Sequence, residues 1–127
     1  MIEVIICDDH ALIRRGIRDT LTDAVDIRVV GEAGDYGELR TLMRKTRCDV
    51  LVLDINMPGR SGLEVLEDIK RLHPQLPVLV LSAFSEEDYA VRAIKLGASG
   101  YLTKQSASDE LIAAINKALA GGKYVTA

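Results

Sequence analysis

Three aspartates follow two short apolar runs in this chain. Asp8 and Asp9 come after residues 4–7, and Asp54 comes after residues 50–53. Runs this short, apolar and rich in β-branched residues are typical of central strands in a parallel sheet. The carboxyl ends of such strands form the ligand crevice of open α/β sheets, so we expect the three carboxylates to lie together there. Because they would repel one another, the group indicates a divalent metal site, and Asp54 is the carboxylate best placed to react.

The composition excludes several classes of function for this segment. A hydrophobic fraction of 48% and a charged fraction of 28% are those of a globular protein, and 127 residues suffice for one domain with a substantial core. A net charge of −3, one Phe and no Trp argue against direct binding of nucleic acid. Because the sequence has no signal peptide and no apolar stretch of membrane-spanning length, we expect a cytoplasmic protein without membrane contact.

The two cysteines, Cys7 and Cys48, each fall in or beside an expected strand, without CxxC spacing or a cluster of histidines. Cysteines in such positions are usually buried free thiols. We therefore expect neither a disulfide nor a thiolate metal site.

Five strand-then-helix units follow one another along the chain. Strands are expected at residues 3–7, 28–33, 50–53, 78–81 and 100–102, with helices at 11–23, 36–46, from about 61, at 86–96 and from about 108. Apolar residues at helical spacing are expected to face the core: Ile13, Ile17, Leu21, Leu39, Leu42, Met43, Leu63, Leu66, Ile69, Leu111, Ile112, Ile115 and Leu119. Strict alternation predicts a single doubly wound α/β domain over residues 1–120, with a parallel sheet covered on both faces. Residues 121–127 are expected to begin a linker.

Two further polar residues follow the fourth and fifth expected strands. Ser82 and Lys104 should therefore reach the same sheet edge as the three aspartates. Together these are the groups that phosphoryl transfer needs. Carboxylates hold Mg²⁺, which prefers oxygen ligands; one carboxylate attacks phosphorus, and the hydroxyl and the amine neutralise the phosphoryl oxygens.

The residues at this edge fall into four short motifs. They are Cys7-Asp8-Asp9-His10, Asp54-Ile55-Asn56-Met57-Pro58-Gly59 with Gly62 following, Leu81-Ser82-Ala83, and Gly100-Tyr101-Leu102-Thr103-Lys104. Together they resemble the receiver domain of two-component response regulators, over essentially the whole chain. The resemblance implies a flavodoxin-like (βα)5 fold with a five-stranded parallel sheet in the order 2-1-3-4-5. It also implies a signalling phosphoacceptor that contributes catalytic groups to its own phosphorylation and dephosphorylation, not a separate enzyme.

The resemblance assigns the acceptor and the metal ligands. Asp54 would take a phosphoryl group from a sensor histidine kinase or a phosphotransfer protein. Asp9, Asp54 and the backbone carbonyl of Asn56 would bind Mg²⁺, the expected cofactor, and Asp8 would reach it through water.

It also assigns the groups that bind and report the phosphate. Ser82 and Lys104 would contact the phosphoryl oxygens. Tyr101 would act with Ser82 as a switch, its ring changing rotamer when the Ser82 hydroxyl moves toward the phosphate.

A finer pattern narrows the resemblance. Residues 8–16 and 96–102 look like the NarL/FixJ class, in which a helix-turn-helix DNA-binding domain follows the receiver. The protein would then contact DNA only through a C-terminal domain absent from this chain. Whether phosphorylation makes two copies of the chain pair stays open.

One residue departs from the pattern of the family. Many receivers follow the lysine of this motif with a proline in a cis peptide bond, whereas Gln105 follows Lys104 here. A cis bond before Gln105 would cost about 2.5–4 kcal/mol, and the isomer stays open.

Each residue also has an ordinary structural explanation. The strand-end acids could cap a helix or begin a turn, Ser82 could cap the next helix, Lys104 could be a surface lysine, and Tyr101 could simply pack. Their joint placement at one edge favours a functional site. His10 is interpreted as a surface residue beside the site, because Mg²⁺ does not favour imidazole, and Arg14 as part of a solvated helix face.

Three other functions share parts of this pattern. A haloacid-dehalogenase-type phosphatase also uses a strand-end aspartate with Mg²⁺, but carries a second aspartate where this chain has Asn56. A flavodoxin-like FMN carrier would need a phosphate loop rich in Ser, Thr and Gly in place of the acidic residues 8–10. A pseudo-receiver that only binds partners usually lacks some of the five groups, and all five are present here. The sequence does not identify the kinase, the regulated genes, the oligomeric state or the lifetime of the phosphoryl group.

Overall fold

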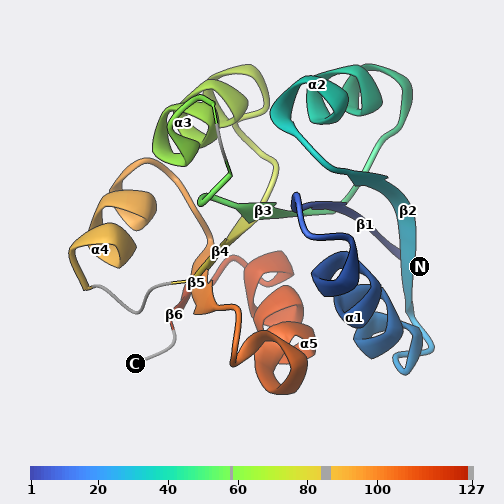
Figure 1. Ribbon diagram of the computed structural model, residues 1–127. Helices are drawn as coiled ribbons and strands as arrows, with labels where there is room; N and C mark the ends of the chain where they lie inside the picture. The colour runs from blue at the N-terminus through green and yellow to red at the C-terminus, as the bar shows by residue number, and fades with distance from the viewer. Residues whose placement is uncertain (58, 84–86, 126–127) are drawn as a thin grey trace.

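A parallel sheet with helices on both faces forms the protein (Figure 1). The computed structural model describes residues 1–57, 59–83 and 87–125. The strands are β1 (Ile2–Cys7), β2 (Ile27–Ala33), β3 (Val50–Asp54), β4 (Val78–Ser82), β5 (Gly100–Thr103) and β6 (Tyr124–Val125). The helices are α1 (Ala11–Thr22), α2 (Tyr36–Lys45), α3 (Gly62–Leu72), α4 (Glu87–Lys95) and α5 (Ala107–Leu119). All strand pairings are parallel, and the order β2-β1-β3-β4-β5-β6 confirms the predicted order of the first five strands.

Two hydrophobic cores lie on opposite faces of the sheet. Helices α1 and α5 cover one face, and α2, α3 and α4 cover the other (Figure 1). Because both faces are covered, the central strands are apolar along almost their whole length, and every residue of β3 and β4 is buried. This packing holds the carboxyl ends of the central strands in fixed positions.

Among the described residues the sheet has six strands, and the expected number of five is wrong. The additional strand, β6, comprises Tyr124 and Val125 and pairs with the edge of β5. Side chains hold this segment in place: the Tyr124 hydroxyl donates to Glu110 Oε1 at 2.6 Å, and Lys123 Nζ donates to the backbone carbonyl of Ala98 at 3.1 Å. A two-residue strand has no periodicity to recognise, which explains why the sequence pattern predicts five strands.

Two burial predictions also need correction. Leu119 was expected in the core but is 39% exposed, because it is the last residue of α5. Cys48 is only half-buried, whereas Cys7 is buried, and both are free thiols.

Two residues of the sequence predictions lie outside the described residues. They are Glu86, the expected first residue of the fourth helix, and Pro58 of the second motif. Within the part of the chain described, no helix is both long enough and apolar enough to cross a bilayer.

Gly62 allows α3 to begin close to the end of β3. A Cβ atom at this position would lie 2.4 Å from the Cα atom and 2.5 Å from the carbonyl oxygen of Ile55. Both are backbone atoms of the residue after Asp54, so they cannot yield without displacing the end of the strand. The glycine in the second motif is therefore required by space.

We expect Gly62→Ala to destabilise the protein by about 1–3 kcal/mol or more, because the added methyl group overlaps the backbone after β3. Gly16→Ala in α1 is the matched control, since nothing lies within 4 Å of its Cβ position. That control should gain about 0.5–1 kcal/mol from the helix preference of alanine. Urea denaturation measures both, and wild-type stability in Gly62→Ala would contradict the steric argument.

Candidate functional site

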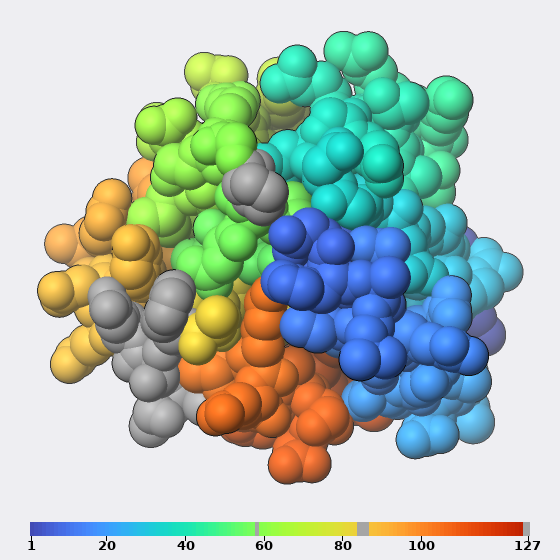
Figure 2. Space-filling model, viewed as in Figure 1, coloured from blue at the N-terminus to red at the C-terminus, as the bar shows by residue number. Residues whose placement is uncertain are grey.

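The strand register brings the predicted acids to one edge of the sheet. Cys7 pairs with Leu53 across β1 and β3, so the residues that follow, Asp8 and Asp54, lie side by side where the two strands end. Both carboxylates are fully buried, while the side chain of Asp9, one residue further along, is 28% exposed. Figure 2 shows the blue, green, yellow and orange segments of the chain meeting near the middle of this face. The structure therefore brings these three acids together.

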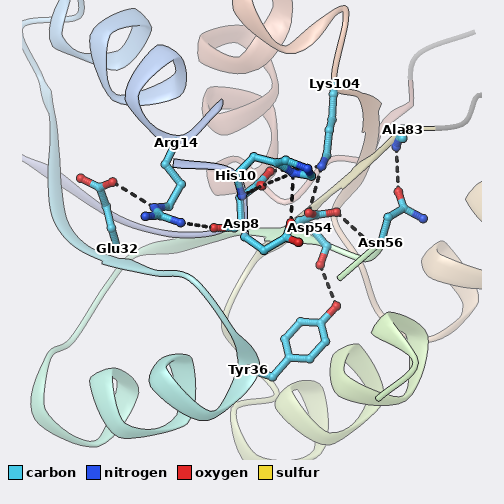
Figure 3. Close-up of polar contacts among 10 residues, drawn as sticks. Asp8, His10, Arg14, Glu32, Tyr36, Asp54, Asn56, Ala83 and Lys104 are labelled. Carbon is cyan, nitrogen blue, oxygen red and sulfur yellow. Dashed lines mark hydrogen bonds and ion pairs between the residues drawn. The ribbon is translucent and has the colours of Figure 1, made fainter. Parts of the chain in front are cut away.

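Lys104 supplies positive charge to this group. Its amine donates a hydrogen bond to Asp54 Oδ2 at 2.9 Å and lies 3.4 Å from Asp8 Oδ2 (Figure 3). Its backbone N–H donates to the carbonyl of Ser82 at 2.9 Å, which holds the residue beside the end of β4. All peptide bonds of the described residues are trans, so the bond from Lys104 to Gln105 is trans.

Asn56 braces the loop after β3 with two hydrogen bonds. Its backbone N–H donates to Asp54 Oδ1 at 2.8 Å, and its side-chain Oδ1 accepts from the backbone N–H of Ala83 at 2.7 Å (Figure 3). The side chain thus ties the β3–α3 loop to the end of β4. An amide cannot act as a general acid, which distinguishes this site from a phosphatase site with a second aspartate here.

Atoms that could bind a metal ion lie close together at this edge. Ligand atoms from Asp8, Asp9, His10 and Asp54 all lie within 4.8 Å of one another. Asp8 Oδ2 is buried, and the Lys104 amine at 3.4 Å forms an ion pair with it without meeting hydrogen-bond geometry. The His10 side chain is 59% exposed, as expected for a surface residue, but its Nδ1 lies 3.0 Å from Asp9 Oδ1. Three carboxylates are the donors that Mg²⁺ prefers, so the residues present fit this ion.

The pKa of three groups is raised here, for different reasons. The pKa of Asp54 is raised chiefly because the carboxyl is removed from water; hydrogen bonds from Asn56 and Lys104 oppose this, and the charge of Asp8 adds to it. Burial, followed by the charge of Asp54, raises the pKa of Cys7 to about 12. Burial alone would lower the pKa of Lys104, but its hydrogen bond to Asp54 and the charges of both acids raise it. With one amine facing two buried carboxylates, an added cation would stabilise the site.

The raised pKa of Asp54 predicts that the metal-free protein loses stability as the pH rises. A carboxyl whose pKa is higher in the folded than in the unfolded state takes up protons on folding between the two values. Its stabilising contribution is fully present below the unfolded value of about 3.9 and is lost as the pH rises through the folded value. Urea denaturation in EDTA between about pH 4 and 7 should show this slope. Asp54→Asn should weaken it, and an unchanged slope in that variant would mean that other groups cause it.

Ser82 and Tyr101, the predicted switch pair, lie on neighbouring strands. Ser82 is the last residue of β4 and is fully buried. Tyr101 pairs with Val80 across β4 and β5 and is buried in the core shared with α4. The Ser82 hydroxyl and the Tyr101 ring therefore lie on two strands that are hydrogen-bonded to each other.

Two residues that were not predicted at the site support it. Tyr36, the first residue of α2, donates its hydroxyl to the backbone carbonyl of Asp54 at 2.9 Å. Arg14 was expected on a solvated face, but its side chain is only 21% exposed; it donates to the backbone carbonyl of Asp8, and its Nε lies 3.5 Å from Glu32 Oε1 (Figure 3). The only available signal for Arg14 is its position one turn into the helix that follows the acids. Tyr36 has none, because α2 and β3 meet only in the folded protein.

Comparison with known proteins gives one family. A family model described as the response regulator receiver domain matches residues 4–116. The chain is 36% identical to the response regulator GacA of Pseudomonas aeruginosa over 126 residues, which cover 99% of this chain and 59% of GacA. It is 38% identical to the transcriptional regulatory protein DegU of Brevibacillus brevis over 124 residues, which cover 98% of this chain and 52% of DegU. The chain thus spans little more than half the length of these relatives.

The fold is also that of a solved relative. The crystal structure of a two-component response regulator of the LuxR family from Aurantimonas sp. SI85-9A1 matches with a TM-score of 0.91 at 34% sequence identity. The match covers 98% of this chain and 89% of that chain.

Proposed function

The chain belongs to the response regulator receiver domain family of two-component signalling, and we propose that its Asp54 accepts a phosphoryl group from a sensor histidine kinase or a phosphotransfer protein. The observation that carries the proposal is the environment of this carboxylate. It ends a central strand, it is buried beside Asp8, and its Oδ2 accepts a hydrogen bond from Lys104 at 2.9 Å. A nucleophilic oxygen and a cationic group for phosphoryl oxygens are thus already adjacent.

The proposed reaction forms one bond to phosphorus and breaks another. A carboxylate oxygen of Asp54 forms the new O–P bond. With phosphohistidine as donor, the P–N bond breaks and its electron pair remains on the imidazole; with acetyl phosphate, a P–O bond breaks and acetate leaves. Lys104 and the hydroxyl of Ser82 then contact the phosphoryl oxygens and offset their charge.

Mg²⁺ is the proposed cofactor. Asp9, Asp54 and the backbone carbonyl of Asn56 would hold the ion, and Asp8 would reach it through water. Bound there, it would add positive charge close to the phosphoryl oxygens. The support is the set of carboxylate oxygens within 4.8 Å of one another, and the buried Asp8 Oδ2, which the described residues engage only through the ion pair with Lys104 at 3.4 Å.

The proposed readout passes through β4 and β5. When Ser82 moves toward the phosphoryl group, Tyr101 would rotate into the space behind β4 and alter the surface formed by α4, β5 and α5. Tyr101 also pairs with Val125 of β6, so the same change would reach the C-terminal segment of this chain.

Transcription is the proposed output. A helix-turn-helix DNA-binding domain would follow residues 121–127, the expected start of the linker, of which Tyr124 and Val125 pair with β5. DNA would be contacted through that domain alone. The support is that DegU is named a transcriptional regulatory protein, and that the matched residues cover only 59% of GacA and 52% of DegU. The proposed compartment is the cytoplasm, and phosphorylation-dependent pairing of two copies is a further proposed interaction.

Incubation with Mg²⁺ and acetyl phosphate, followed by intact mass measurement, tests the proposal. We expect the protein to gain one phosphoryl group, and EDTA to prevent the gain. No gain from acetyl phosphate or from a phosphorylated kinase would refute the function. Turnover of added phosphomonoesters would instead favour a phosphatase.

Asp9→Ala should slow phosphorylation and weaken Mg²⁺ binding, because a proposed oxygen ligand of the ion is lost. In EDTA the same variant should melt at a higher temperature than wild-type, since one of three mutually repelling carboxylates is gone. Asp19→Ala on α1 changes the charge equally and is the control. Thermal melts and Mg²⁺ titrations measure the two effects; normal Mg²⁺ affinity with a lower melting temperature in EDTA would contradict both.

A further inference from the structure

A groove between α2 and α3 lies apart from the proposed phosphoacceptor site. It has a volume of about 720 Å³ and runs from Tyr36 and Gly59 at one end to Arg44 and His73 at the other. The two helices have 10 and 11 residues, so the groove is about 15 Å long at 1.5 Å per residue. Figure 1 shows the two helices side by side on the same face of the sheet.

The floor of this groove is apolar. Leu39 and Met43 line it from α2, and Val65, Ile69 and Leu72 line it from α3. These residues repeat at helical spacing along both walls. Leu72 is 69% exposed, so the floor continues onto the open surface. Leu39, Val65 and Ile69 are buried at the bottom of the groove, so Met43, which is half-buried, and Leu72 supply the apolar surface that a partner could cover. A short apolar surface between two helices fits one apolar face of a third helix.

The rim is positively charged, although the protein has a net charge of −3. The charged residues that line the groove are Arg40, Arg44, Arg60, Arg71, Asp35 and Asp68. Asp68 is already engaged, since Arg60 donates to it at 2.7 Å and Arg71 at 3.2 Å. Arg40 and Arg44 are exposed and form no ion pair within 4.0 Å among the described residues. Two guanidinium groups along one wall are therefore available to an acidic partner.

We propose that this groove binds an acidic amphipathic helix of a protein partner, about three turns long. Its apolar side chains would cover Met43 and Leu72, and its carboxylates would pair with Arg40 and Arg44. A compact ligand fits less well, because small-molecule sites need a few polar groups that converge in an enclosed pocket. The inference goes beyond the proposed function and does not depend on it.

The position of the groove also connects it to β3. Tyr36 lines one end, and its hydroxyl donates to the backbone carbonyl of Asp54 at 2.9 Å. A helix in the groove would therefore lie one side chain away from the proposed phosphoacceptor, on a surface distinct from that of α4, β5 and α5.

The test uses two synthetic acetylated peptides that form amphipathic helices with leucines on one face. One carries glutamates beside the leucines, and the other carries lysines at the same positions. Each is titrated into isotope-labelled protein, and the amide chemical shifts locate the site and give Kd. We expect the acidic peptide to shift amides of α2 and α3 and to bind there at least about tenfold more tightly than the basic peptide.

Charge reversal tests the rim. The double variant Arg40→Glu with Arg44→Glu should weaken the acidic peptide by roughly tenfold or more, because like charges would face each other across the groove. Arg15→Glu with Lys117→Glu is the control, since both residues are exposed on α1 and α5. The control should leave Kd unchanged, and circular dichroism verifies that both double variants are folded.

A polar substitution tests the floor. Leu72→Gln should also weaken the acidic peptide, whereas Leu12→Gln, at a position 80% exposed on α1, should not. Both side chains are exposed, so neither change should disturb the core.

Three outcomes would overturn the inference. The first is no shift in α2 or α3, or equal binding of the two peptides. The second is that dodecanoate, titrated in the same way, binds in the groove while neither peptide does, which would assign the groove to a small anionic amphiphile. The third is that the protein self-associates and the double variant Arg40→Glu with Arg44→Glu does not, which would make a second copy of the chain the occupant of the groove. Each leaves the phosphorylation of Asp54 intact, so failure here is distinguishable from failure of the proposed function.

Discussion

Asp54→Asn is expected to abolish phosphorylation of this protein. Asparagine keeps the shape of the side chain, and its amide oxygen can still accept the N–H of Asn56, which lies 2.8 Å from Oδ1 in the wild-type. It lacks the carboxylate oxygen that must form the bond to phosphorus. After incubation with acetyl phosphate and Mg²⁺, intact mass should show one phosphoryl group on the wild-type protein and none on the variant.

Asp8→Asn is the matched control, because it changes the other fully buried carboxylate of the site. That variant keeps the proposed acceptor and should still gain the phosphoryl group, at a lower rate because the acidic cluster is altered. Should Asp54→Asn be modified as readily as the wild-type, the acceptor is another residue, and peptide mapping of the modified protein would locate it.

The edge of the sheet could be predicted because polarity changes sharply at each strand end. Asp8, Asp54 and Ser82 each come directly at the end of a buried apolar run, and parallel strands place their carboxyl ends together. Lys104 likewise comes directly after the last residue of β5, although that strand is short and its last residue, Thr103, is polar. The resemblance of the motifs then supplied roles that the pattern alone left open.

Contacts between distant elements could not be predicted in this way. Tyr36 and Arg14 reach the backbone of Asp54 and Asp8 only because α2 and α1 pack against the sheet at particular positions. β6 is equally dependent on context, since two residues become a strand only through the edge of β5. Such contacts depend on the distances between packed elements, and the periodicity of a sequence carries no information about them.

Lys104→Ala is expected to lower the stability of the metal-free protein while leaving the acceptor in place. Asp8 and Asp54 are both fully buried, and the amine lies within 3.4 Å of each. Removing one partner of a buried ion pair costs about 3–5 kcal/mol, and Mg²⁺ should restore much of this loss by replacing the missing charge. Lys95→Ala, at an exposed position of α4, is the control and should change stability little. Urea denaturation with EDTA and with Mg²⁺ separates the two contributions.

The same variant should also separate phosphorylation from the conformational response. In the wild-type, the Lys104 amine contacts Asp54 and its backbone N–H donates to the carbonyl of Ser82, so one residue joins the acceptor to both β4 and β5. Beryllofluoride, an acyl-phosphate mimic, should change amide exchange in α4 and β5 of the wild-type, and the change should be much smaller in Lys104→Ala. An equal change in the variant would mean that Ser82 alone carries the coupling. No change in the wild-type, despite bound beryllofluoride, would contradict the switch through Tyr101, and the readout would then have to leave Asp54 by another route.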